Sequence, residues 1–127
     1  MALIAAVISL ILLEYYVFMM LVGMARGKSG IQAPQMTGDP KLERAIRVQM
    51  NTLEQMVVVI PCLWLFGTYI STTIGAGLGV AFIIGRALYC KGYMADPNKR
   101  AIGFVIGFLA TLGLLGGAVY GTVMAAL

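Results

Sequence analysis

Four long apolar stretches, separated by short polar segments, constrain the fold of this chain more than any other feature. The hydrocarbon core of a bilayer is about 30 Å thick, and a helix needs about 20 apolar residues to cross it. Only 11% of the residues are charged, whereas soluble domains carry about 25%. We therefore predict an all-α, integral-membrane four-helix bundle that forms a single domain over residues 1–127.

Proline and small polar residues indicate where the spans begin and end. Asp39-Pro40 and Asp96-Pro97 each place an N-cap residue before a proline suited to the first helical position. Residues 25–39 are expected to form a loop and residues 71–73 a tight turn, and Pro61 is expected to kink the second span. The N-terminus has no basic segment before its apolar run, so we expect a retained span. The expected spans are about 2–24, 41–69, 73–94 and 97–127.

Positive charge is distributed very unevenly between the two ends of the predicted bundle. The segments after the first and third spans lie on one side of the membrane, and every basic residue lies in or beside them. By the positive-inside rule, this face is cytoplasmic and both termini are on the opposite side. The basic residues are Arg26, Lys28, Lys41, Arg44, Arg47, Arg86, Lys91, Lys99 and Arg100.

The residue types that are missing restrict the chemistry. The chain has no histidine, which excludes His-based acid–base catalysis and axial His ligation of haem, and makes a zinc site unexpected. Cys62 and Cys90 are single cysteines within predicted spans, so they form neither a CxxC pair nor a disulfide framework. We expect no metal site, and any chemistry must use Arg, Lys, Tyr, Ser, Thr or the carboxylates.

Polar residues recur at helical spacing near the basic end of the second span. Arg44, Arg47, Asn51 and Glu54 are separated by three, four and three residues, so they form one stripe on a helix. Such groups are costly at membrane depth unless they face a cavity, a partner or a ligand. Arg47 and Glu54 are also compatible with a purely structural ion pair.

A second set of polar residues lies near the end of the third span. Arg86, Tyr89 and Tyr93 share one helix face, although the tyrosines alone are compatible with an interfacial aromatic belt. Arg26 and Arg100 lie at the same end of the predicted bundle. Arginine binds carboxylates with a planar fork, and Glu54 is placed to hold an ammonium group.

These residues suit a small, zwitterionic, polyanionic ligand with a thiol, and glutathione is the candidate we favour. It has two carboxylates for arginines and one ammonium for a glutamate. A thiol with a pKa of about 8.5 is mostly protonated at neutral pH. A guanidinium beside the sulfur would lower that pKa by ~2 units and make the thiolate dominant without any histidine.

Two segments resemble the MAPEG family (membrane-associated proteins in eicosanoid and glutathione metabolism). ERAIRVQMNTLE, residues 43–54, is similar to the signature of the family's second helix. GRALYCKGYMADPNKRAIGF, residues 85–104, is similar to its third-to-fourth helix segment. The resemblance covers essentially the whole chain, although Gln55 stands where some members carry an aromatic residue.

The resemblance implies a homotrimer that binds glutathione between subunits and conjugates it to lipophilic electrophiles, with possible peroxidase activity and a role in detoxification. It assigns thiolate stabilisation to Arg100, with the Tyr93 hydroxyl as second choice. It assigns glutathione binding to Arg26, Arg47, Gln49, Asn51, Glu54, Arg86, Tyr89 and Tyr93. Membrane lipid is the other expected partner, and no nucleic acid is expected.

Two alternatives remain open at this stage. Glu14 lies in the middle of the first span, as in small proton-coupled multidrug exporters of similar size, although a ring of arginines does not suit a cationic drug. A structural carboxylate is the interpretation of Glu14 that we favour. The second alternative is a non-catalytic, lipid-binding member of the same fold.

Overall fold

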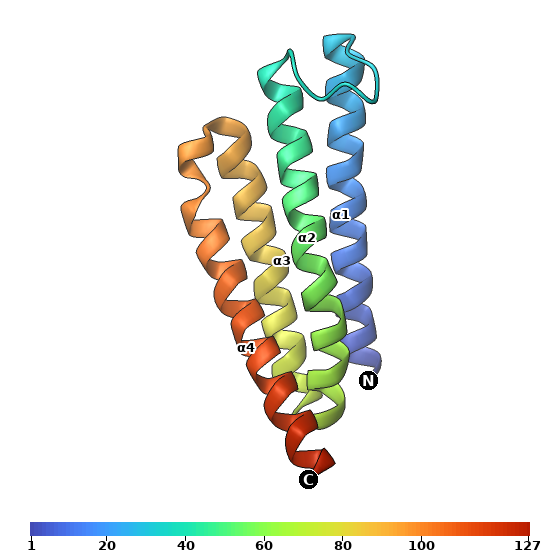
Figure 1. Cartoon of the computed structure of the whole chain (residues 1–127), viewed down its shortest axis with the longest axis vertical. Helices are drawn as coiled ribbons and strands as arrows, with labels where there is room; N and C mark the ends of the chain where they lie inside the picture. The colour runs from blue at the N-terminus through green and yellow to red at the C-terminus, as the bar shows by residue number, and fades with distance from the viewer.

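The computed structural model describes all residues from Met1 to Leu127 and contains only helices (Figure 1). Four of them are long and apolar enough to cross a membrane. The all-α prediction is therefore confirmed. The elements are α1 (Ala2–Ser29), α2 (Pro40–Tyr69), α3 (Thr72–Ala95), a short 3₁₀ helix η1 (Pro97–Lys99) and α4 (Ala101–Ala126).

The first connecting loop is shorter than expected, because α1 continues to Ser29. Arg26 and Lys28 lie in its last turn, where positive charge interacts favourably with the helix dipole. Gly30 then ends the helix with a left-handed φ of 75°, a conformation that glycine adopts without penalty. The expected start of α2 is confirmed: the Asp39 carboxylate accepts a hydrogen bond of 3.0 Å from the backbone N–H of Leu42.

The two remaining boundaries also differ from expectation. Residues 71–73 are not a turn, because Ser71 is the N-cap of α3 and its hydroxyl accepts a hydrogen bond from the N–H of Ile74. The fourth long helix does not begin at Pro97. Asp96-Pro97 instead starts η1, and α4 follows from Ala101. Asp96 is a cap, as the Asp-Pro pair predicts, but the length of the helix behind a cap depends on tertiary packing.

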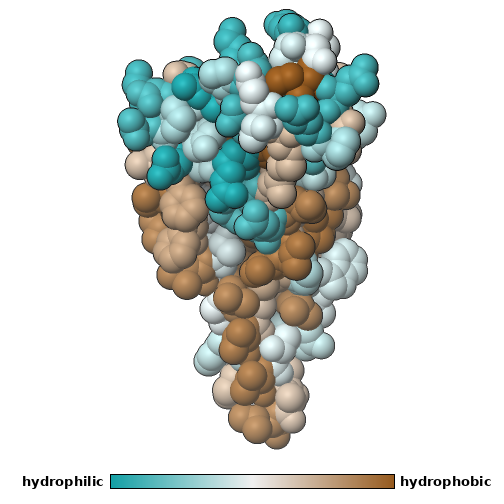
Figure 2. Space-filling view, turned by 45° about the horizontal axis from the view of Figure 1, so that its top comes forward, coloured by the Kyte–Doolittle hydropathy of each residue, from teal (hydrophilic) through white to brown (hydrophobic).

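The helices lie side by side with the basic segments at one end. α2 and α3 form the centre, α1 packs against both on one side, and α4 packs against both on the other. The α1–α2 and α3–α4 connections lie at the upper end in Figure 1, and both termini lie at the lower end. Figure 2 shows that hydrophilic residues gather at the upper end, and that mainly apolar residues, with some of intermediate hydropathy, cover the rest of that face. The sequence-predicted separation of basic loops from termini is thus present in the fold.

The closest helix contact is between α3 and α4, and glycines make it possible. A Cβ atom added at Gly85 would lie 2.7 Å from the backbone nitrogen of Gly107 and 3.0 Å from the carbonyl oxygen of Gly103. The backbones of the two helices therefore touch directly, as small residues allow in membrane bundles. Gly103 and Gly107 therefore serve packing within one chain.

Candidate functional site

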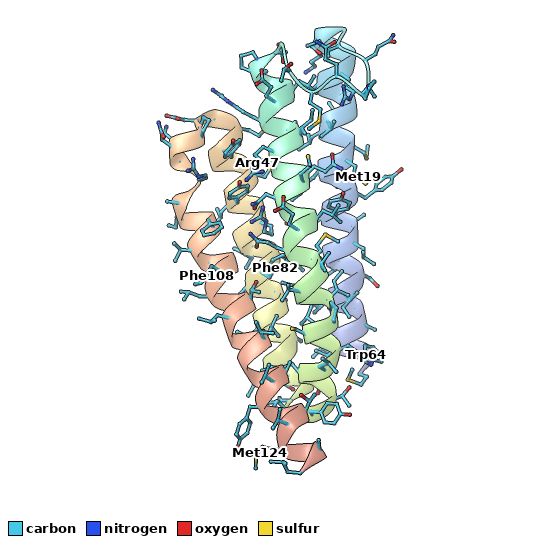
Figure 3. All side chains as sticks on the ribbon, in the orientation of Figure 1. Met19, Arg47, Trp64, Phe82, Phe108 and Met124 are labelled. Carbon is cyan, nitrogen blue, oxygen red and sulfur yellow. The ribbon has the colours of Figure 1, made fainter.

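A hollow at the polar end of the bundle brings together residues from α2, α3 and the start of α4. Its volume is about 280 Å³. Figure 3 shows Arg47 in this polar half of the bundle, while Phe82 and Phe108 lie further toward the end that carries the termini. The lining residues are Arg47, Asn51, Tyr89, Tyr93, Arg100 and Phe104. Five of these six residues were predicted from the sequence.

Two further spaces adjoin the hollow and share lining residues with it. Toward the middle of the bundle, a second space of about 250 Å³ shares Asn51 and is lined by Glu54, Gln55 and Phe108, among others. Toward the outside, a third space of about 430 Å³ shares Arg100 and Phe104. We call the three adjoining spaces the α2–α4 groove. Arginine and tyrosine side chains line its polar end, and mainly apolar side chains line its part along α4.

Arg86 lies beneath the groove and does not line it. Its side chain is completely buried, with 0% of its surface exposed. Its Nε and Nη2 atoms donate hydrogen bonds of 3.2 and 2.9 Å to the Thr52 hydroxyl, and Nη2 also donates one of 2.8 Å to Asn51 Oδ1. The guanidinium therefore ties α3 to α2 and holds the Asn51 amide at the floor of the groove.

The two tyrosines form a wall of stacked rings. The ring centroids of Tyr89 and Tyr93 are 5.6 Å apart, and the rings are nearly parallel, with 19° between their planes. The Arg86 guanidinium carbon lies 4.1 Å from the centroid of the Tyr89 ring, which is a cation–π contact. Tyr89 is buried and Tyr93 is partly exposed. The wall is thus fixed from below by Arg86 and is accessible at Tyr93.

Arg100 stands at the mouth of the groove, where η1 joins α4. It is the N-cap residue of α4, and its Nη1 atom donates a hydrogen bond of 2.7 Å to the carbonyl oxygen of Pro97. Its side chain is exposed. A free helix N-terminus carries partial positive charge. The guanidinium and the start of α4 therefore both favour an anion at this place.

Arg26 and Gln49 lie outside the groove of their own chain. The Arg26 Nη1 atom donates hydrogen bonds to the carbonyl oxygens of Ile31 and Gln35 in the α1–α2 loop. The Gln49 amide donates one of 3.0 Å to the hydroxyl of Tyr15 on α1. Both residues therefore belong to the α1 side of α2, whereas the groove lies on its α4 side. Arg44 is likewise engaged elsewhere, because it donates to the carbonyl oxygens at the end of α3.

Arg47 and Glu54 are both exposed and open onto different parts of the groove. Arg47 lines the polar hollow, and Glu54 lines the neighbouring space toward the centre of the bundle. They are seven residues apart in the sequence, which is about 10 Å along a helix axis. The structural ion pair considered for these two residues is therefore not formed within α2.

Sequence reasoning missed several residues of the groove and its support, and three of them adjoin residues that it predicted. Thr52 accepts both hydrogen bonds from Arg86, although its position between the apolar residues Val48 and Met56 indicated a buried stripe. Gln55 donates a hydrogen bond of 3.3 Å to Asn51 Oδ1. Phe104 lies four residues after Arg100, which was the available signal that both face the same way.

The arrangement is suited to a small anionic ligand at the edge of the membrane. Arg47 and Arg100 present exposed guanidinium groups to the polar hollow, and Glu54 presents a carboxylate nearby. Asn51 and the tyrosine hydroxyls can accept or donate hydrogen bonds. The apolar part of the groove along α4 can receive a lipophilic molecule from the bilayer.

Comparison with known proteins agrees with this geometry. The model of the MAPEG family matches residues 3–120. Microsomal glutathione S-transferase 2 of Homo sapiens is 40% identical over 116 residues, which cover 90% of this chain and 79% of that protein. Leukotriene C4 synthase of Cavia porcellus is 32% identical, with coverage of 83% and 75%. An uncharacterised protein of Synechocystis sp. is 43% identical, with coverage of 90% and 83%.

Proposed function

Because the chain belongs to the MAPEG family, we propose that it is a glutathione-dependent membrane transferase that conjugates glutathione to lipophilic electrophiles. One observation carries the proposal: the cationic and aromatic residues that the chemistry needs line one hollow, and that hollow opens toward the apolar face of α4. Microsomal glutathione S-transferase relatives support the same activity. Removal of reactive lipophiles would be the biological use.

Glutathione is proposed to lie with its charged groups on α2 and its sulfur toward α4. Arg47 would bind a carboxylate, Glu54 the ammonium group, and the Asn51 amide the peptide backbone. Tyr89 and Tyr93 would form the wall behind the tripeptide. Arg86 contributes from beneath, because its hydrogen bond to Asn51 fixes the direction in which that amide points.

Arg100 is proposed to keep the sulfur ionised. Its guanidinium stays charged at every relevant pH, and the N-terminus of α4 adds positive potential at the same place. The thiolate sulfur attacks the electrophilic carbon, forming a C–S bond while the leaving group departs with its electron pair. When the electrophile is an epoxide, the C–O bond breaks and the oxygen takes a proton, for which the Tyr93 hydroxyl is the proposed donor.

The same thiolate can account for a peroxidase activity. It attacks the terminal oxygen of a hydroperoxide, the O–O bond breaks, and the alkoxide leaves and is protonated to the alcohol. The sulfenic acid of glutathione then reacts with a second glutathione thiol to give the disulfide and water. Two thiols are oxidised and one hydroperoxide is reduced, so the reaction balances without any metal or further reductant.

A homotrimer is proposed because one chain provides only part of the site. Arg26 and Gln49 face the α1 side, so they can reach glutathione only if that side of one subunit lies against the groove of the next. The basic end is proposed to be cytoplasmic from the positive-inside rule, with both termini on the other side.

The purified protein in detergent tests the proposal directly. Glutathione is added together with an aryl halide, a lipid hydroperoxide or a fatty epoxide, and thioether or disulfide formation is measured. Bound glutathione with an unshifted thiol pKa and no product would favour the lipid-binding alternative. Proton-driven uptake of a lipophilic cation into vesicles, lost in Glu14→Gln, would favour the exporter instead.

A further inference from the structure

Two buried side-chain atoms in the whole chain have no hydrogen-bond partner, and they carry opposite charges. One is Glu14 Oε1 on α1, and the other is Arg86 Nη1 on α3. A charged side chain at membrane depth costs free energy unless an opposite charge or a hydrogen-bond partner compensates it. Two such atoms in one small bundle call for a common explanation.

The two side chains lie at the same level of the bundle, where α1 packs against α3. Ile11 and Phe82, one turn before Glu14 and Arg86 respectively, share a buried cluster. Phe18 and Cys90, one turn after them, share another. The other polar atoms of Arg86 are already used, because Nε and Nη2 donate to Thr52 and Asn51. The only free edge of the guanidinium is therefore Nη1, and the only buried acceptor without a donor is on Glu14.

Arg86 in turn connects this pair to the groove. Its Nη2 atom holds Asn51 Oδ1 at 2.8 Å, and its guanidinium packs on the Tyr89 ring at 4.1 Å. Asn51 lines both the polar hollow and the adjoining space, and Tyr89 lines the polar hollow. Any shift of the guanidinium therefore moves two residues that face the ligand.

We propose that Glu14 is the counter-ion of Arg86, joined to Nη1 through one water, and that it is a positioning residue for glutathione. Glu14 does not touch the ligand. It acts by holding the guanidinium in the orientation that presents Asn51 and Tyr89 to the groove. This role rests on the proposed function, whereas the pairing of Glu14 with Arg86 does not.

The pairing is tested by thermal unfolding of four proteins: wild type, Glu14→Gln, Arg86→Gln and the double variant. Each single variant leaves one buried charge without its counter-ion, so each should lower the unfolding temperature. The double variant has neither charge and should unfold at or above the temperature of Arg86→Gln. If the two losses simply add, the residues are independent and the pairing is refuted. Glu43→Gln, the same substitution on an exposed carboxylate, is the matched control.

The positioning role is tested by equilibrium binding of glutathione and by kinetics. Glu14→Gln should weaken glutathione binding about tenfold, while kcat at saturating glutathione changes less than about twofold because Arg100 is untouched. In an Asn51→Ala background the same substitution should have a smaller further effect, since Asn51 is one of the two residues through which it acts. Full glutathione affinity in a folded Glu14→Gln protein would overturn the role.

The two tests separate the possible failures. If the wild-type protein binds no glutathione, the proposed function is wrong and the positioning role falls with it, but the unfolding temperatures still decide the pairing. If Arg86→Gln does not fold and the double variant does, the pairing is supported. If Glu14→Gln lowers kcat and leaves glutathione affinity unchanged, Glu14 acts on the chemistry by another route and the positioning role is refuted.

Discussion

Replacing Arg100 with alanine should reduce conjugation far more than glutathione binding. A unit charge 4 Å from the sulfur is worth about 4 kcal/mol at an effective dielectric constant of 20, and this is an upper value because the Arg100 side chain is exposed. We assign to Arg100 a lowering of the glutathione thiol pKa by ~2 units, or ~2.7 kcal/mol, which is less than this upper value. Bound glutathione with a thiol pKa of about 6.5 is about 75% thiolate at pH 7, whereas a thiol pKa of about 8.5 gives about 3%.

The expected loss in kcat at pH 7 is therefore about 25-fold, and raising the pH to 9 should recover most of it. The sign follows from the chemistry: without the guanidinium the thiol pKa is higher, so more base is needed to form the thiolate. Lys99→Ala removes a neighbouring positive charge that does not line the groove and is the matched control. Conjugation by Arg100→Ala at the wild-type rate at pH 7 would refute the assigned role.

Three further substitutions test the framework around the site. Thr52→Val removes the acceptor of two buried Arg86 hydrogen bonds and should cost about 2–3 kcal/mol of unfolding free energy; Thr68→Val, an exposed threonine on the same helix, should cost much less. Gly103→Ala forces α4 away from the α3 backbone and should lower the free energy of unfolding by about 1–3 kcal/mol. Gly116 has open space around it, so Gly116→Ala should leave the free energy of unfolding unchanged or raise it. Equal effects of the two substitutions would contradict the close α3–α4 packing. Asp39→Ala removes the cap of α2 and should cost about 1 kcal/mol in chemical denaturation, and no change would mean that the cap is dispensable.

Local chemistry explains which parts of the fold were predictable. Asp39 and Pro40 specify a helix start by themselves, because the cap needs only a carboxylate and a nearby backbone N–H. The end of α1 was placed too early, because Arg26 and Lys28 were interpreted as loop residues. Their charges are compatible with a last helical turn, and the left-handed Gly30 marks the true end. Charge alone does not distinguish a loop from a helix terminus.

The groove could be predicted in part from helical spacing. Arg47 and Asn51 are four residues apart, so they had to share a face, and Gln49 lies two residues from each and had to point elsewhere. Its contact with Tyr15 on α1 agrees with that geometry. The partner of a buried side chain cannot be predicted from spacing along one helix. That Arg86 would meet Thr52 depends on how α3 is rotated against α2, which the close α3–α4 contact at Gly85 helps to set.

The proposed pairing of Glu14 with Arg86 likewise could not be predicted from sequence spacing. A carboxylate in the middle of a span predicts a functional or paired group, but the partner that we propose for Glu14 is seventy-two residues away on another helix. Sequence spacing cannot connect the two. The three-helix packing of α1, α2 and α3 connects them and leaves one unpartnered atom on each.

The ionisation state of bound glutathione tests the central claim most directly. The ultraviolet absorbance of the thiolate is recorded as a function of pH for wild-type protein saturated with glutathione, with a non-thiol analogue as blank. The account predicts a midpoint below pH 7, about 2 units under that of the free thiol. A midpoint near 8.5, the value of an unperturbed thiol, would show that the guanidinium groups of the groove do not activate the sulfur.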